Sequence, residues 1–174
     1  MTDPLMTPNL GTAMLEHRDR IDFGALRAGR RAHVLTAMES QGLDACIFGR
    51  EANVRYVSGA RRLWTAGSRP FAPSCAIVRA TGAVHMLSHS ASYEGIPEEL
   101  APDDIFPLTW DPANFVAMAA ETPGLTAARR IGVDGMTPLC QQWRGNPLRG
   151  AALVPVEATM RGLRSITLPD EILY

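Results

Sequence analysis

The sequence contains no lysine, because all 17 of its basic residues are arginine. Chemistry that depends on a lysine amine, such as Schiff-base formation or phosphate binding by a P-loop lysine, is therefore excluded. Cysteine is also scarce, with three residues and no Cys-x-x-Cys spacing. An odd number of cysteines cannot all pair within the chain, so a disulfide scaffold is excluded and a reducing, cytoplasmic compartment is expected.

Several sequence signatures of common enzyme classes are missing as well. The chain has no Walker A, G-x-G-x-x-G, G-x-S-x-G or S-x-x-K motif, so nucleotide binding and the common serine mechanisms have no support. The formal net charge of −1 argues against a nucleic-acid partner. No apolar run approaches the roughly 20 residues of a membrane span, and no secretory signal is expected at the amino terminus.

What the sequence does contain is a series of alternating helical and strand-like segments. A chain of 174 residues can bury roughly 70% of its extended surface, so it needs no metal or disulfide to fold. The short apolar runs 45–49 and 131–134 predict buried strands, and the runs 74–79 and 83–89 predict a hairpin. Helices are expected over 26–41, 51–57, 111–121, 137–144 and 157–163, with further strands at 104–108 and 152–156. The pattern predicts an α/β domain with a mixed β-sheet flanked by helices.

Histidine and cysteine offer few candidates for metal binding or catalysis. His85 and His89 share one face of a predicted strand and would provide two ligands of a zinc or iron site, but a third ligand is missing nearby. Ordinary polar or core positions are therefore favoured for both. Cys46 and Cys75 lie in apolar strand-like runs and Cys140 in a predicted helix, so all three are expected to be inert core residues.

Two pairs of adjacent carboxylates, Glu98-Glu99 and Asp103-Asp104, interrupt the apolar pattern. Adjacent side chains diverge on a strand and on a helix, so neither pair is placed to share a proton. A solvated acidic loop is the favoured interpretation for both.

A loop over residues 60–72 carries the strongest candidates for ligand contact. Arg62 and Arg69 lie near Trp64 and Phe71 in a segment without regular periodicity. A guanidinium beside an aromatic ring suits a carboxylate-bearing ligand, because the fork binds the anion and the ring covers the apolar part. The alternative is that these arginines are solvent-exposed or pair with acidic residues elsewhere in the domain.

Three segments, taken in order, resemble a known family. Residues 53–59 (Asn-Val-Arg-Tyr-Val-Ser-Gly) resemble the N-I-x-Y-L-T/S-G segment of the amino-terminal domain of the creatinase, prolidase and aminopeptidase P family. Residues 130–134 (Arg-Ile-Gly-Val-Asp) resemble its R-I-G-V-(D/E) element. Residues 164–172 (Arg-Ser-Ile-Thr-Leu-Pro-Asp-Glu-Ile) resemble the R-x-I-K-x-P-x-E-I junction that leads into the catalytic domain, with Thr167 in place of the junction lysine.

The resemblance implies a three-layer, ribonuclease H-like domain without ribonuclease chemistry. It also implies a division into an arm over residues 1–24, the domain over 25–164, and the start of a linker helix over 165–174. In the family, a metal pair (Mn, Co or Zn) is held by two aspartates, a histidine and two glutamates of the catalytic domain. None of these ligands maps onto this sequence, so we expect no catalytic residue, metal or cofactor in this chain.

The first hypothesis is accordingly a non-catalytic amino-terminal domain that provides dimer contacts and substrate closure for an Xaa-Pro dipeptidase, aminopeptidase or creatinase-like hydrolase. By the resemblance, Arg69 and Trp64 would contact the carboxylate of a small molecule or dipeptide, with Arg62 and Phe71 beside them. One alternative is a free-standing peptide- or protein-binding module, and another is a fragment of a related dimethylsulfoniopropionate lyase. A self-contained enzyme that uses His85 and His89 is a further, weaker alternative. No nucleic acid or membrane is expected as a partner.

Overall fold

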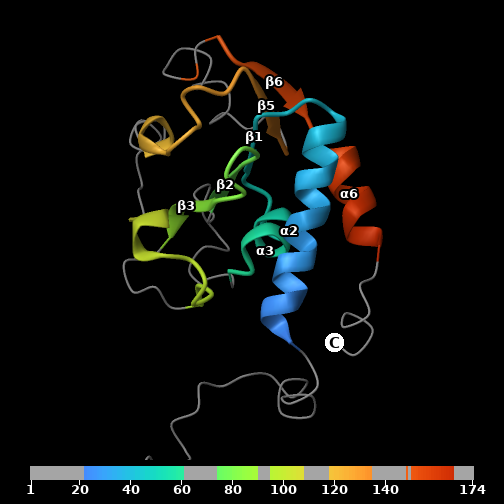
Figure 1. Cartoon of the computed structure of the whole chain (residues 1–174), viewed down its shortest axis with the longest axis vertical. Coiled ribbons are helices and arrows are strands. Elements are labelled where there is room, and N and C mark those ends of the chain that lie inside the picture. The colour runs from blue at the N-terminus through green and yellow to red at the C-terminus, as the bar shows by residue number, and fades with distance from the viewer. Residues whose placement is uncertain are drawn as a thin grey trace, which may run out of the picture.

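The computed structural model describes residues 22–60, 74–89, 95–107, 118–134, 148 and 150–166. A sheet runs through its centre, with α-helices packed along one side (Figure 1). In chain order the elements are α2 (Phe23–Ser40), β1 (Ala45–Phe48), α3 (Glu51–Ser58), β2 (Ser74–Val78), β3 (Val84–His89), the 3₁₀ helix η2 (Pro102–Asp104), β4 (Ile105–Pro107), β5 (Arg130–Val133), β6 (Ala152–Pro155) and α6 (Glu157–Ser165). Residues 118–121 form a further helical turn.

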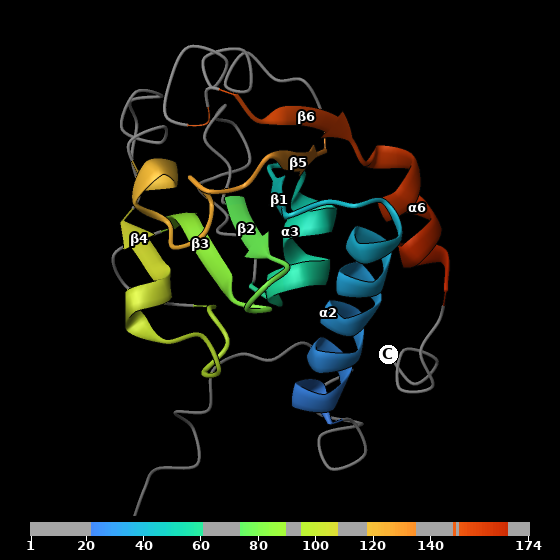
Figure 2. The ribbon, with the colours of Figure 1, turned by 45° about the horizontal axis from the view of Figure 1, so that its top comes forward.

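The sheet has six strands in the order β4-β3-β2-β1-β5-β6, which the tilted view displays side by side (Figure 2). β2 runs antiparallel to both of its neighbours, β1 and β3, while the pairs β3–β4, β1–β5 and β5–β6 are parallel. The predicted hairpin is therefore confirmed as β2–β3. The order and directions confirm the predicted mixed sheet.

Each face of the sheet is covered by its own core, because alternate residues of a strand point to opposite faces. One core joins strand residues such as Cys46 and Phe48 to α2, α3 and α6. The other joins Ala45 and Ile47 to the segment 118–128. All four residues of β1 are buried, as the unbroken apolar run predicts. The two covered faces give the three layers that were expected.

The predicted carboxyl ends of the first two helices are confirmed by their capping geometry, whereas α2 begins three residues before its predicted start. Asp22 caps α2 there, and its side chain accepts a hydrogen bond of 2.8 Å from Ala25 N. Gly42 follows α2 with φ 62°, and Gly59 follows α3 with φ 73°. These left-handed conformations favour glycine. A Cβ atom at Gly59 would also collide with the Arg27 side chain.

Gly132 in the middle of β5 has a packing role. An added Cβ atom there would lie 2.5 Å from Cys46 Sγ and 2.8 Å from Val156 Cγ1. Both distances are shorter than any normal carbon contact, and both neighbours are buried. The absence of a side chain at Gly132 therefore lets Cys46 of the neighbouring strand β1 and Val156, which precedes α6, pack closely against β5.

The edge strand β4 agrees with its prediction, since Pro107 lies at its end, where a missing N–H is tolerated. The 3₁₀ helix before it was not predicted. The predicted helix 137–144 and most of the predicted helix 111–121 lie outside the described residues. None of the helices in the described ranges combines the length and the hydropathy that crossing a bilayer requires.

Candidate functional site

The four predicted substrate contacts, Arg62, Trp64, Arg69 and Phe71, fall within residues 61–73, which lie outside the described part of the chain. Cys140 also lies outside it. These assignments therefore stay predictions.

His85 is described and occupies a buried position, as the favoured interpretation predicted. Its Nδ1 lies 2.8 Å from Asp104 Oδ1, although the two residues belong to β3 and η2. Burial lowers the pKa of the imidazole, against the attraction of the Asp104 carboxylate. The predicted solvated acidic loop agrees with the exposure of Glu98, Glu99 and Asp103. Two of the acids also form contacts that were not predicted: Asp104 lies against His85, and Glu99 accepts a 2.6 Å hydrogen bond from Arg27 Nε. Both contacts link segments far apart in the sequence, which local patterns do not reveal.

The described cysteines are core residues, as expected. Cys46 and Cys75 are free thiols and buried. Burial raises the pKa of the Cys46 thiol to about 12 and raises the pKa of Cys75 as well. Neither thiol is a nucleophile at neutral pH.

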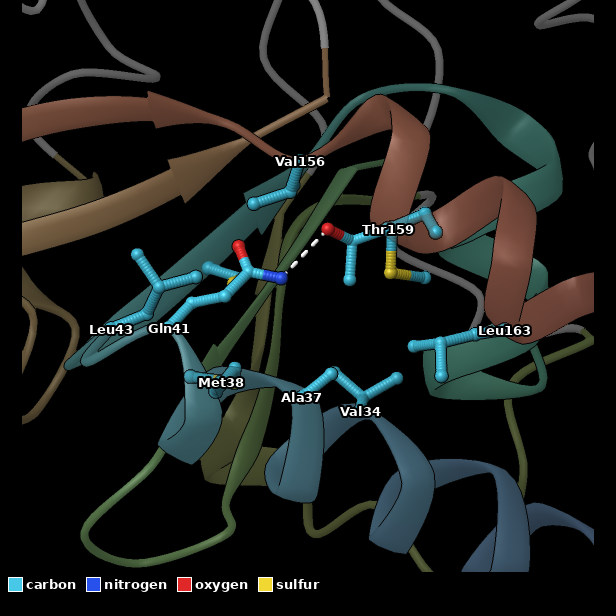
Figure 3. A pocket seen from close by; sticks show the side chains of 10 residues that line it. Val34, Ala37, Met38, Gln41, Leu43, Val156, Thr159 and Leu163 are labelled. Carbon is cyan, nitrogen blue, oxygen red and sulfur yellow. Dashed lines mark hydrogen bonds between the residues drawn. The ribbon is translucent and has the colours of Figure 1, made fainter.

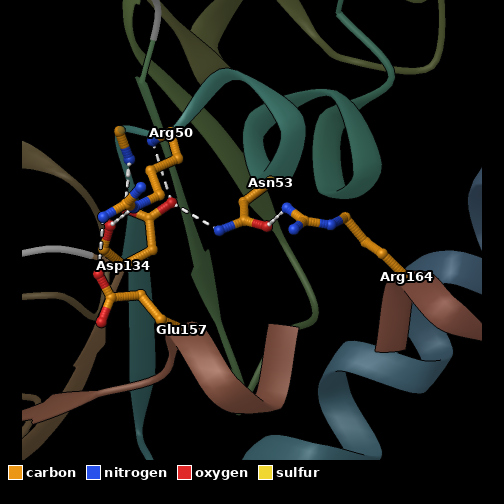
Figure 4. Close-up of polar contacts among 6 residues, drawn as sticks. Arg50, Asn53, Asp134, Glu157 and Arg164 are labelled. Atoms are coloured by element: carbon orange, nitrogen blue, oxygen red, sulfur yellow. Dashed lines mark hydrogen bonds and ion pairs between the residues drawn. The ribbon is translucent and has the colours of Figure 1, made fainter. Parts of the chain in front are cut away.

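The main polar feature of the described residues is a group that we call the strand-end cluster. Its members are Arg50, Asn53, Asp134, Glu157 and Arg164 (Figure 4). Asp134 directly follows β5, and Arg50 precedes α3, which carries Asn53. Because β1 and β5 are parallel neighbours, their carboxyl ends meet at the same edge of the sheet, and the cluster forms there.

Asp134 is the centre of this cluster. It is only 4% exposed, and its carboxylate accepts hydrogen bonds from Gly49 N (2.8 Å), Arg50 N (3.0 Å) and Asn53 Nδ2 (2.8 Å). Its main-chain oxygen accepts a fourth from Arg50 Nε at 2.9 Å. Burial raises the pKa of Asp134, against the lowering by these donors. Arg50, the N-cap residue of α3, makes no side-chain cap hydrogen bond, so the Asp134 carboxylate, directly after β5, accepts from the main chain at the amino terminus of this helix.

Asn53 and the last turn of α6 extend the cluster. Asn53 is 2% exposed, and its Oδ1 accepts a hydrogen bond from Arg164 Nη1. At the other end of α6, Arg50 Nη2 donates to Glu157 Oε1 at 2.9 Å. That second pair is open to solvent, with side chains 62% and 39% exposed, so it contributes little stability.

The chemistry of the cluster is that of a structural support. Asp134 and Asn53 satisfy the donors around them, and the five members include no serine, cysteine, histidine or lysine. Within the described ranges, no group of three or more histidine, cysteine or acidic residues is placed to hold a metal ion.

An apolar pocket also lies between α2 and α6 (Figure 3). Val34, Met38 and Leu163 are among its lining residues, and a 2.7 Å hydrogen bond from Gln41 Nε2 to Thr159 Oγ1 spans it. Cys46 is the only ionisable group among the described lining residues, and its thiol stays protonated. The pocket lies between α2 and α6, and the described residues that line it include no acid–base pair.

Sequence reasoning did not identify the cluster, although it had singled out all three segments that meet there. The partners of Asp134 lie 81 to 85 residues away in the sequence. A usable signal was present in two of the segments: an amide on the buried side of a helix, and an acid directly after a buried strand.

Comparison with known proteins places this fold among a set of peptidase domains. The family model described as Creatinase/Prolidase N-terminal domain matches residues 30–166. No curated protein matches the sequence. An Xaa-Pro aminopeptidase (aminopeptidase P) from Streptococcus thermophilus is 16% identical with a TM-score of 0.56, and the match covers 79% of this chain and 98% of that one.

Two further solved structures are similar. The N-terminal domain of the cytoplasmic peptidase PepQ from Mycobacterium tuberculosis H37Rv is 21% identical with a TM-score of 0.54, and the match covers 78% of this chain and 98% of that one. The prolidase from Pyrococcus horikoshii OT3 is 16% identical with a TM-score of 0.57, over 83% of this chain. The match spans only 37% of that prolidase. At these identities the similarity shows a common fold.

Proposed function

The chain belongs to the creatinase/prolidase N-terminal domain family, and from this premise we propose that it is the non-catalytic amino-terminal domain of a metal-dependent hydrolase of the Xaa-Pro peptidase or creatinase type. The observation that carries the proposal is the share of each similar chain that the structural match covers. The match takes in 98% of the PepQ N-terminal domain but only 37% of a prolidase chain. A domain of this size and fold therefore corresponds to one part of such an enzyme.

The proposed role is to contribute dimer contacts and to close the substrate site of a catalytic domain. Arg69 and Trp64 would contact the substrate carboxylate, with Arg62 and Phe71 beside them. A guanidinium fork binds a carboxylate through two parallel hydrogen bonds, and an indole ring covers the adjoining apolar group. The substrate would be an Xaa-Pro dipeptide or another small molecule with a carboxylate. We propose a cytoplasmic location, because PepQ, whose N-terminal domain shares this fold, is a cytoplasmic peptidase.

The hydrolytic step itself belongs to the catalytic domain. There a pair of divalent metal ions (Mn, Co or Zn) would activate water for attack on a carbonyl group. The strand-end cluster supports this division of labour, because the Asp134 carboxylate and the Asn53 amide are already engaged by neighbouring donors. The Glu157 carboxylate is paired with Arg50, and the cluster holds the sheet edge together.

The proposal is tested by two measurements. The reading frame downstream of codon 174 is expected to encode two aspartates, a histidine and two glutamates as metal ligands. The purified 174-residue chain, supplied with Mn²⁺, Co²⁺ or Zn²⁺, is expected to leave Xaa-Pro dipeptides intact and to bind no stoichiometric metal in calorimetry. Turnover by this chain alone contradicts the proposal. A stop codon at that position favours a free-standing binding module, and a downstream domain with lyase activity favours the related lyase.

A further inference from the structure

Within the last turn of α6, one apolar side chain, the partly buried Leu163, packs against the core, where it lines the apolar pocket with Val34 and Met38. Met160 anchors the first half of the helix and is 2% exposed. From residue 161 to residue 166 no side chain is buried, and Ile166 is 51% exposed. Gly162 lies within this stretch and lowers its helix propensity. A helix of nine residues does not persist on its own, so the last turn needs another contact to hold it.

That contact is polar and comes from α3. Arg164 Nη1 donates to Asn53 Oδ1, and Tyr56 donates from its hydroxyl to the Leu163 main-chain oxygen over 3.4 Å. Figure 4 shows the Arg164 side chain extending from the end of α6 toward Asn53. The hydroxyl contact is long, so the Arg164 contact is the stronger of the two.

The Asn53 amide connects two groups of opposite hydrogen-bonding character. An ionised carboxylate only accepts and a guanidinium only donates, so the amide must direct Nδ2 to Asp134 and Oδ1 to Arg164. An aspartate at this position would face Asp134 with a like charge, and an apolar residue would remove one donor from Asp134 and the amide acceptor from Arg164. Through these two hydrogen bonds, Asn53 therefore connects Asp134, at the end of β5, to the last turn of α6.

We propose that Asp134, Asn53 and Arg164 form a lock that fixes the last turn of α6 to the carboxyl end of β5, and so sets the direction in which the chain leaves the domain after Ile166. The use of that direction, to hold the domain over a catalytic domain, rests on the proposed function. The lock itself is a property of the described residues. We call these three residues the exit lock.

The first test is amide hydrogen exchange of the 174-residue chain. Arg164→Ala is expected to accelerate exchange of residues 162–166 about tenfold, the size that loss of one hydrogen bond to a charged group produces, while residues in the first turn of α6 keep their rates. The matched control is Arg161→Ala, because Arg161 is exposed on the same helix and has no polar contact among the described residues. Equal rates in the two variants, or acceleration along the whole helix, overturn the proposal.

The second test uses the amide chemistry of the lock. Asn53→Asp places a second carboxyl group against Asp134, so this variant is expected to be destabilised at neutral pH. As the pH falls, one of the two carboxyl groups binds a proton and again donates, so the loss of stability relative to wild type shrinks. If the Asn53→Asp variant is unfolded at neutral pH and folds only at acidic pH, this result also supports the lock. A loss that stays the same from about pH 7 to about pH 4, across the range in which carboxyl groups titrate, overturns it.

The third test separates the lock from the proposed function. In the protein that carries the downstream domain, Arg164→Ala is expected to raise KM for an Xaa-Pro dipeptide severalfold, with a smaller change in kcat. If the isolated chain shows the exchange effect and the longer protein has no peptidase activity, the proposed function fails and the lock stands. If the longer protein is a peptidase and Arg164→Ala behaves as Arg161→Ala in both assays, the lock fails.

Discussion

Replacing Asp134 by alanine is expected to destabilise the domain strongly. The substitution leaves three donors without their acceptor, namely Gly49 N, Arg50 N and Asn53 Nδ2. An unsatisfied buried donor costs about 1–3 kcal/mol. Gly49 and Arg50 are exposed residues, so water replaces part of the loss at their amides. The expected decrease in the free energy of unfolding is therefore about 3–5 kcal/mol, a large part of the 5–15 kcal/mol typical of a domain.

The assay is urea unfolding followed by circular dichroism, with the free energy obtained by linear extrapolation. Asp44→Ala is the matched control, because Asp44 also accepts two main-chain hydrogen bonds, from Arg129 N (2.8 Å) and Arg130 N (3.0 Å). Its side chain is 37% exposed, so water takes over its donors and the expected loss is about 1 kcal/mol. A loss for Asp134→Ala no larger than that of the control would refute the reasoning.

Three further results are expected. Gly132→Ala should lower the free energy of unfolding by about 1–3 kcal/mol in the same assay, because its Cβ atom would overlap Cys46; an unchanged midpoint argues against this packing. Since burial lowers the pKa of His85 in the folded state, the unfolded chain binds the proton first, and stability should fall from about pH 7 to about pH 5. His85→Gln removes this titrating group beside Asp104, so the variant should lose less stability than the wild-type protein between these pH values. Identical pH profiles of stability for the two proteins would contradict this expectation. Mass spectrometry after iodoacetamide treatment should find Cys46 and Cys75 unmodified in the folded chain and modified in urea, whereas labelling of either in the folded chain is the contrary result.

The order of helices and strands could be predicted from the sequence because it depends on local patterns. The run 45–48 is apolar throughout and forms a strand buried on both faces. Gly42 and Gly59 end their helices in left-handed conformations that favour glycine. Such signals lie within a few residues of the structure that they specify.

The strand-end cluster could not be predicted in the same way, because its contacts join distant segments. Arg164 and Asn53 are 111 residues apart, and Asn53 and Asp134 are 81 residues apart. Their proximity depends on the parallel pairing of β1 with β5, which no periodicity reveals. The same reason explains why Asp104 was interpreted as solvated although it contacts His85.

The cluster also gives a physical reason for the segments that carried the family resemblance. Asn53 and Asp134 join α3 to β5, and Ser58 Oγ accepts from Ala60 N at 3.1 Å where α3 ends. Gly132 allows the close approach of β1 and α6. In the described structure these residues fix the ends of helices and strands, which is a structural role.

The most direct test of the proposed function is the steady-state kinetics of Xaa-Pro dipeptide hydrolysis by the protein that joins residues 1–174 to the downstream domain. Arg69→Ala is compared with Arg161→Ala in a common metal buffer. The account predicts a KM at least about tenfold higher for Arg69→Ala, as expected when a hydrogen-bonded carboxylate contact is lost, and unchanged kinetics for Arg161→Ala. Identical KM values for the two variants and the wild-type protein would contradict it.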